Sequence, residues 1–294
     1  MRICEKIKQL MHRSGNNIRK SINNLMVSYS DHGPEDAPVI IFIHGFPLNK
    51  SMWDMQVGAL KENYRVIAYD IRGHGNSDPG IDEFFIELFV NDLLRLMEKL
   101  GIEKSILCGL SLGGYIALNA VLKYPDRFDG LILNDTQCIA DTPEIKENRC
   151  LAITRIMKDG VGQYADEIIE NLFARESFIK KKNEIAAVTE MITNTTKQSL
   201  CNTLHALAER KETCDRLPEI NIPVLIMVGK EDKITPIAAA RQMHEKILNS
   251  KLKIIQHAGH LSNLENSAEF NFQLGKFLER VGKKSFCFSD TDGN

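Results

Sequence analysis

The chain has 294 residues, of which 43% are hydrophobic and 26% charged, and its formal net charge is −2. These values are typical of a globular protein and exclude a disordered or fibrous chain. The length is enough for one large domain, or for one domain that carries an insertion. The near-neutral charge shows no basic surplus of the kind that nucleic-acid-binding proteins use, so no nucleic-acid partner is expected.

The seven cysteines are scattered along the chain and never form a CxxC pair. Their odd number predicts reduced thiols rather than a disulfide framework or a zinc site, which favours a cytoplasmic location. No apolar run approaches the roughly 18 residues of a membrane span, so no membrane association is expected. Residues 1–16 form a basic N-terminal extension without the apolar block of a signal peptide. We expect a short amphipathic surface helix there.

After this extension the pattern predicts two strands joined by a tight turn. Residues 17–22 and 25–30 flank Asn23-Asn24, and Asn tolerates the left-handed backbone of a hairpin turn. Continuous apolar runs then recur, as expected of strands that are buried on both faces of a parallel sheet. These runs are VIIFI (39–43), YRVIAYD (64–70), SILCGL (105–110), FDGLILND (128–135), PVLIMVG (223–229) and KLKIIQH (251–257).

Helical patterns alternate with these runs, at residues 84–100 and 114–123. Strand–helix alternation predicts an α/β fold, a mostly parallel sheet between two layers of helices. The alternation stops after Asp135, and residues 136–217 show only helical periodicity, most clearly at 145–157, 163–173 and 199–209. We therefore expect a helical cap at 136–217 that forms a lid over the carboxyl ends of the strands. The rest of the chain is expected to form the α/β core, at residues 17–135 and 218–282, and a mobile C-terminal tail at residues 283–294.

A G-x-S-x-G motif marks the candidate nucleophile. Residues 109–113, with Ser111 at the centre, directly follow an apolar strand and precede a helical run. In this context the motif predicts a nucleophile elbow, a sharp turn that projects the serine hydroxyl. The flanking glycines are needed because a Cβ atom would clash with neighbouring chain, and the helix N-terminus adds positive partial charge where an oxyanion forms. The alternative is a Gly-rich turn or a phosphate loop, which the flanking strand and helix disfavour.

Strand 39–43 runs into a sharp loop, His44-Gly45-Phe46-Pro47. An oxyanion hole beside a nucleophile elbow takes one amide from the residue after the nucleophile and one from such a loop. The expected donors are therefore the backbone N–H groups of Leu112 and Phe46. We interpret His44 as a buried structural imidazole, because a general base needs a carboxylate partner and a place beside the nucleophile.

His260 follows the last expected strand, where the base must lie if the chain order is serine, acid, histidine. Its neutral imidazole can take the serine proton and return it to the leaving group. Ser262 and Glu265 are three residues apart and predict a capping box that starts the next helix and fixes this loop. His257 is the alternative base, but it lies within or at the end of the strand, so His260 is favoured.

The acid that orients His260 is expected in the loop after strand 223–229, where Glu231 and Asp232 are adjacent. A short Asx side chain suits the turn that follows, so Asp232 is favoured and Glu231 is expected to face solvent. Asp135 is a rival, because it ends the preceding strand and could reach the same histidine.

Five motifs follow one another along the chain: HGFP, D-x-R-G-H-G-x-S at residues 70–77, GLSLGG, GKEDKITP and AGHLSNLE. In this order they resemble the alpha/beta hydrolases, most closely the oxoadipate enol-lactonase and small-carboxylesterase group. The likeness extends from Ile22 to Arg280. It implies an alpha/beta-hydrolase fold, no metal or cofactor, and a cap that lines the acyl or leaving-group pocket. We interpret Arg72 and His74 as structural residues of their loop.

The resemblance also implies a triad of Ser111, Asp232 and His260 in a serine hydrolase. Its expected substrate is a small carboxylic ester or lactone, cleaved through an acyl-enzyme. A serine at the elbow excludes dehalogenases and epoxide hydrolases of this fold, which use an aspartate nucleophile. Two alternatives keep the triad: a cofactor-free perhydrolase or haloperoxidase, and a ligand-binding receptor of the same fold. Nothing in the sequence indicates the oligomeric state.

Overall fold

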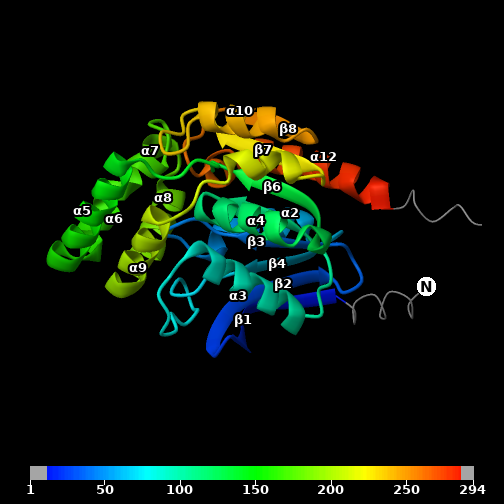
Figure 1. Ribbon diagram of the computed structural model, residues 1–294, viewed down its shortest axis with the longest axis horizontal. Coiled ribbons are helices and arrows are strands. Elements are labelled where there is room, and N and C mark those ends of the chain that lie inside the picture. Colours follow the sequence, from blue (N-terminus) through cyan, green and yellow to red (C-terminus); the bar gives the residue numbers. More distant parts are fainter. Residues whose placement is uncertain (1–11, 286–294) are drawn as a thin grey trace, which may run out of the picture.

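The computed structural model describes residues 12–285, which contain one eight-stranded sheet (Figure 1). The strands lie in the order β1-β2-β4-β3-β5-β6-β7-β8. β2 pairs antiparallel with β1 and β4, whereas all other neighbouring strands are parallel. The mostly parallel α/β sheet expected from the sequence is confirmed. The strands are β1 His12–Ile22, β2 Leu25–Pro34, β3 Val39–Ile43, β4 Arg65–Tyr69, β5 Ser105–Leu110, β6 Phe128–Asn134, β7 Val224–Gly229 and β8 Ser250–Ile255.

The N-terminal hairpin is longer than expected. Asn23 and Asn24, with φ of 44° and 61°, form the predicted two-residue turn. β1 begins at His12, so residues 12–16, which were assigned to the extension, belong to the sheet. Their strand pattern is hard to read because β1 is an edge strand and much of it faces solvent. The expected surface helix falls largely on residues 1–11, outside the described range.

Helices cover both faces of the sheet, as the parallel strands require. α3 and α4 pack against each other in front of the sheet in Figure 1, and α2 packs against α12. These helices are α2 Asp54–Leu60, α3 Ile86–Lys99, α4 Leu112–Lys123, α10 Ile237–Lys246, α11 Ser262–Glu265 and α12 Ser267–Ser285, with short 3₁₀ turns η1 Lys50–Trp53, η2 Pro125–Arg127 and η3 Cys214–Glu219. No helix within residues 12–285 is long and apolar enough to cross a membrane.

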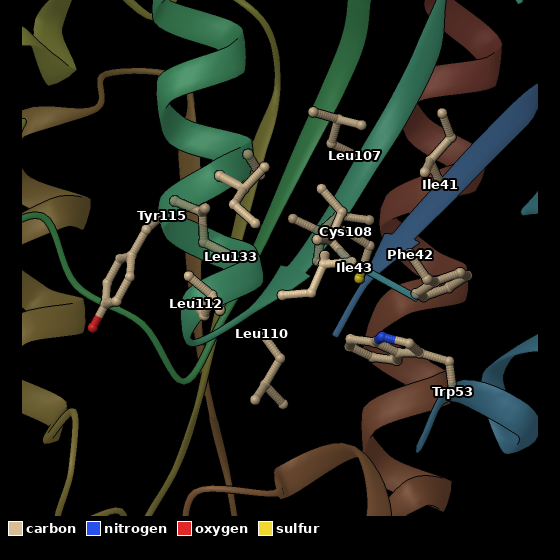
Figure 2. Packing of buried hydrophobic residues seen from close by; sticks show 14 of the residues in the cluster. Ile41, Phe42, Ile43, Trp53, Leu107, Cys108, Leu110, Leu112, Tyr115 and Leu133 are labelled. Atoms are coloured by element: carbon tan, nitrogen blue, oxygen red, sulfur yellow. The ribbon is translucent and has the colours of Figure 1, made fainter. Parts of the chain in front are cut away.

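The core lies between these layers. In Figure 2, Leu112 and Tyr115 of α4 lie on one side of β3 and β5, and Trp53 lies on the other side against Phe42. The ring centroids of Phe42 and Trp53 are 4.8 Å apart, and both side chains are fully buried. Each large apolar side chain buried in this way contributes about 1.5–3 kcal/mol to stability. The central strands are therefore the rigid frame on which the loops at their ends are mounted.

Between β6 and β7 the chain forms only helices, gathered at one end of the sheet (Figure 1). The three expected segments correspond to α5, α6 and α9, although the second and third run one residue past the helix end, and two further helices, α7 and α8, stand between α6 and α9. The helices are α5 Pro143–Asp159, α6 Val161–Leu172, α7 Ser177–Lys180, α8 Lys182–Thr193 and α9 Lys197–Ala208. We refer to residues 136–217 as the helical insertion.

Cys138 and Cys214 form a disulfide. This corrects the expectation that all cysteines are reduced, and it removes the cysteine argument for a cytoplasmic location. The two residues are 76 positions apart, at opposite ends of the helical insertion, so their spacing in the sequence does not reveal the pair. Cys108, Cys150 and Cys201 are free thiols, and Cys4 and Cys287 lie outside the described residues.

The C-terminal helix α12 continues to Ser285. Residues 283–285, which were expected to begin a mobile tail, therefore belong to a helix. The rest of that expected tail, residues 286–294, lies outside the described range.

Candidate active site

Ser111 stands between the last residue of β5 and the first residue of α4. Its φ of 52° and ψ of −113° lie where a side chain is strained. The end of β6 and the residues after it hold this conformation. The Ser111 amide donates to the carbonyl of Asn134 at 3.0 Å, and the Ser111 carbonyl accepts from the hydroxyl of Thr136 at 2.9 Å. The strand–turn–helix predicted for the G-x-S-x-G motif is confirmed.

The glycines around Ser111 are required by space. A Cβ atom on Gly109 would lie 2.2 Å from the carbonyl oxygen of Gly113, and one on Gly113 would lie 2.1 Å from that of Ile43. Backbone atoms cannot approach a Cβ so closely, so a side chain at either position would force the turn open. The tight contact with β3 therefore fixes the serine relative to the sheet.

The loop after β3 lies directly against the elbow. A Cβ atom on Gly45 would lie 3.4 Å from the Cβ of Ser111. The next residue, Phe46, is buried, and neither its amide nor that of Leu112 donates a hydrogen bond within residues 12–285. Two amides without an acceptor in this range, one in the residue after Ser111 and one in the loop packed against Ser111, fit the arrangement of an oxyanion hole.

The histidines and the arginine near this loop have structural partners. His44 is buried, its Nδ1 donates to the next carbonyl at 2.9 Å, and its Nε2 accepts from the amide of Ile71 at 3.0 Å. Burial lowers the pKa of His44, and it lowers the pKa of His74 to about 3. Arg72 is buried and donates to both carboxylate oxygens of Asp92, at 2.6 and 2.9 Å. Nδ1 of His74 lies 3.1 Å from the carbonyl oxygen of Arg72, and its Nε2 is buried without a hydrogen-bond partner in the described chain. The contacts of His44 and Arg72 support the structural interpretation of these two residues.

His260 and Asp232 come together from the loops that follow β8 and β7. Nδ1 of His260 lies 2.9 Å from Oδ2 of Asp232, and the histidine is only 2% exposed. In the expected Asx-type turn, Oδ1 of Asp232 accepts from the amides of Ile234 and Thr235 at 2.8 and 3.0 Å. The hydroxyl of Thr235 also donates to Oδ2 at 2.7 Å, a contact that sequence reasoning missed although the Asp-x-x-Thr spacing could have indicated it. The carboxylate is thus fixed independently of the histidine.

The pair shifts the pKa values of both partners. Burial acts to lower the pKa of His260, but the charge and hydrogen bond of Asp232 raise it above its usual value. Burial acts to raise the pKa of Asp232, but His260 and the donors of Thr235 hold it below its usual value. The pair therefore favours an imidazolium beside a carboxylate, the state that forms when the histidine takes a proton. Within residues 12–285 no hydrogen bond joins Ser111 to His260, and such contacts often tighten only when substrate binds.

Asp135, the rival acid, has different partners. Its Oδ1 accepts from the amide of Gly229 at 2.7 Å and its Oδ2 accepts from the hydroxyl of Ser262 at 2.5 Å, with no hydrogen bond to His260 in the described chain. Burial, and then the nearby charge of Asp232, raise the pKa of Asp135 well above its usual range. A carboxyl group that favours its neutral form is a poor partner for an imidazolium, so the geometry favours Asp232.

The other two rivals point to solvent. His257 lies in the turn after β8, its side chain is 72% exposed, and its Nδ1 is 3.1 Å from a carboxylate oxygen of Glu176. Glu231 is exposed. Neither residue is brought to the buried pair of His260 and Asp232.

The capping box predicted at Ser262 and Glu265 is wrong. Ser262 is the first residue of α11 rather than its cap, and its hydroxyl donates to Asp135. The carboxylate of Glu265 accepts from the amide of Gly259 and from groups in the helical insertion. Both side chains are buried, and apart from Gly259 the partners named here lie 88 or more residues away in the sequence, which a local spacing rule does not detect.

Comparisons with known proteins agree with this architecture. Residues 38–267 match the family described as alpha/beta hydrolase fold. A 3-oxoadipate enol-lactonase of Acinetobacter baylyi is 30% identical over 87% of this chain and 94% of its own length. A bifunctional esterase/perhydrolase of Acinetobacter calcoaceticus is 29% identical over 77% of this chain and 86% of its own length. The solved structure of a thermophilic esterase from Thermogutta terrifontis has a TM-score of 0.84 and 32% identity, over 92% of this chain and 99% of that one. The chain therefore belongs to the alpha/beta hydrolase family.

Proposed function

We propose that this hydrolase cleaves a small carboxylic ester or lactone, with Ser111 as nucleophile, His260 as base and Asp232 as the acid that orients it. The observation that carries the proposal is the strained backbone of Ser111, which has a φ of 52°. The loops after β7 and β8 add the buried hydrogen bond of 2.9 Å between His260 and Asp232. Backbone strain of this kind costs of order 1–3 kcal/mol and clusters at active sites. The esterase and enol-lactonase relatives support the substrate class.

In the first step, His260 takes the hydroxyl proton of Ser111 while Oγ attacks the carbonyl carbon. The carbonyl oxygen becomes an oxyanion, which the amides of Phe46 and Leu112 stabilise by hydrogen bonds. When the tetrahedral intermediate collapses, the C–O bond to the leaving group breaks and His260 returns the proton to that oxygen. The product is an acyl-enzyme; from a lactone, the leaving oxygen stays attached to the acyl chain.

In the second step, water replaces Ser111 as the nucleophile. His260 takes a proton from the water, the hydroxide attacks the acyl carbon, and the same two amides hold the oxyanion again. Collapse breaks the bond to Ser111, which recovers its proton from His260. Asp232 stays ionised throughout and stabilises the imidazolium in both steps.

We propose that the helical insertion, residues 136–217, is a cap that shapes the substrate pocket, while residues 17–135 and 218–282 form the core. Its helices lie together at one end of the sheet (Figure 1). The insertion also contacts the loop of the base, because the carbonyl of Leu172 accepts from the amide of His260 at 3.1 Å. Differences in these helices are then expected to set the acyl preference.

Perhydrolysis is the second candidate activity, supported by the relative named as a bifunctional esterase/perhydrolase. Both reactions share the acyl-enzyme and differ only in the acceptor, which is water in one and hydrogen peroxide in the other. The same residues therefore serve both candidates.

The test compares the native enzyme with Ser111→Ala on a series of p-nitrophenyl esters and an enol-lactone. Ser21→Ala, an exposed serine of β1, is the matched control. We expect Ser111→Ala to lower turnover by about 10³-fold or more and to abolish an acyl adduct visible by intact mass, with Ser21→Ala unchanged. Adding hydrogen peroxide shows how the acyl-enzyme partitions between the two acceptors. Full activity in Ser111→Ala would contradict the proposal, and native enzyme without turnover or adduct would favour a ligand-binding receptor.

A further inference from the structure

Glu265 is a buried carboxylate that accepts hydrogen bonds from two distant parts of the chain. Its Oε1 accepts from the amide of Gly259 at 2.8 Å. Its Oε2 accepts from the amide of Ala174 at 2.7 Å and from the hydroxyl of Ser177 at 2.6 Å. Gly259 directly precedes His260, whereas Ala174 lies between α6 and α7 and Ser177 is the first residue of α7. One carboxylate, 5% exposed, therefore bridges the loop of the base and the helical insertion.

Two further contacts join the same parts of the chain. We call residues 172–177 the insertion turn. The amide of His260 donates to the carbonyl of Leu172 at 3.1 Å. A Cβ atom on Gly259 would lie 2.7 Å from the backbone nitrogen of Ala174, so glycine is needed for this close approach. The insertion turn is thus seated on the loop of the base by hydrogen bonds and by packing.

No lysine or arginine pairs with Glu265 within residues 12–285. Burial raises the pKa of this carboxyl group, and the donors of Ser177, Ala174 and Gly259 oppose the rise. A buried carboxylate without a cationic partner is costly unless its oxygens are hydrogen-bonded, as they are here. Glutamine would supply only one acceptor oxygen and would turn an NH₂ group towards one of the donors. The site therefore suits a carboxylate and disfavours its amide.

We infer that Glu265 is a positioning residue for His260, an inference that rests on the catalytic role proposed for that histidine. Asp232 orients the imidazole ring through Nδ1, whereas Glu265 fixes the backbone that carries the ring by holding Gly259 against the insertion turn. A misplacement of about 1 Å in a catalytic group can cost about 100-fold in rate. The helical insertion thereby helps to fix the position of His260, in addition to shaping the substrate pocket.

The test compares Glu265→Gln with Glu231→Gln, the same change at an exposed site in the adjacent loop. Both are made in the full-length enzyme and assayed on the best p-nitrophenyl ester. We expect Glu265→Gln to lower kcat about 10- to 100-fold while KM stays within about twofold, because the base moves but the pocket stays. Glu231→Gln should match the native enzyme. The rate at which a fluorophosphonate labels Ser111 should fall in parallel with kcat.

Two further variants change the partners of Glu265 instead of Glu265 itself. They test the same contact if Glu265→Gln does not fold. Ser177→Ala removes one donor from the insertion side, and we expect kcat to fall about two- to fivefold. Gly259→Ala inserts a methyl group between the loop and the insertion turn, and we expect a fall in kcat similar to that of Glu265→Gln. Combining Gly259→Ala with Glu265→Gln should give less than the product of the two effects, since both break one contact.

Native kcat in both Glu265→Gln and Ser177→Ala would overturn the inference. So would a loss of kcat that only follows the unfolded fraction measured by circular dichroism. Failure of the proposed function looks different, because Ser111→Ala would then retain activity whatever happens at Glu265.

Discussion

Ser111 and His260 are held in place by different means. The turn of Ser111 is fixed by close backbone packing with residues two positions away, Gly109 and Gly113, and with the neighbouring strands. The loop of His260 is fixed by hydrogen bonds to residues of other elements, such as Leu172 at the end of α6. The carboxylate of Glu265, in α11, accepts from Gly259 of this loop and also from two donors of the insertion, at sequence separations of 88 and 91. The position of Ser111 is therefore set by the rigid sheet, whereas that of His260 depends on contacts that the helical insertion makes.

Among changes that leave Ser111 intact, Asp232→Asn is expected to have the largest effect on activity, because it removes the charge that orients and stabilises His260. The amide cannot stabilise an imidazolium and favours the wrong tautomer of His260. We expect kcat to fall about 10³- to 10⁴-fold with the fold unchanged, since the Asx-type turn can still form. Steady-state kinetics with circular dichroism checks this. Activity above about a tenth of the native value would contradict the assignment of Asp232 as the acid.

Gly109→Ala tests the close backbone packing that fixes the turn of Ser111. Its Cβ would lie 2.2 Å from a backbone oxygen, so we expect a loss of at least about 3 kcal/mol in unfolding free energy, measured by urea denaturation. Gly58→Ala is the matched control, because nothing lies within 4 Å of its Cβ and it stands in α2. A helical glycine with free space should gain about 0.5–1 kcal/mol on this change. Equal effects of the two variants would contradict the packing argument.

This contrast explains what the sequence could predict. The elbow at Ser111 depends on neighbouring residues, so a short motif identified it, and the apolar runs identified the strands. The partners of Glu265 come from another part of the chain, so a spacing of three residues suggested a capping box that does not exist. The disulfide was missed for the same reason, since its cysteines stand 76 residues apart. Burial, which decides these long-range partners, is a property of the assembled fold.

The disulfide ties the two ends of the helical insertion to each other, and its loss should loosen that region. Replacing both Cys138 and Cys214 by Ala should lower the unfolding free energy by about 2–4 kcal/mol, as expected for a long closed loop. Thermal unfolding measures the change, and Cys150→Ala, at an exposed free thiol, is the control. A double variant as stable as the native enzyme would show that helix packing alone stabilises the insertion and that the disulfide adds nothing.

The pH profile sharpens the assignment of the base. His260 must be neutral to accept a proton, and Asp232 raises the pKa of His260 above its usual 6.5. Activity should therefore rise with pH and reach half its maximum above pH 6.5, measured as kcat/KM on a substrate that does not titrate. In Asp232→Asn the charge and hydrogen bond of Asp232, the largest effects that raise this pKa, are lost, while the smaller effects of Asp135 and Glu265 remain. The midpoint should therefore move to lower pH as the maximum falls. A midpoint that stays in place would mean that another group limits the rate.

The smallest effect is expected from Asp135→Asn, which separates the two candidate acids. Burial and the charge of Asp232 favour the neutral form of Asp135, so a neutral amide of the same shape replaces it with little electrostatic change. The amide oxygen can still accept one of the hydrogen bonds from Gly229 and Ser262, and the other is weakened. We expect kcat to fall less than about tenfold. A loss as large as that of Asp232→Asn would show that both carboxyl groups act on His260 as one unit, because Ser262 couples Asp135 to the loop that carries the base.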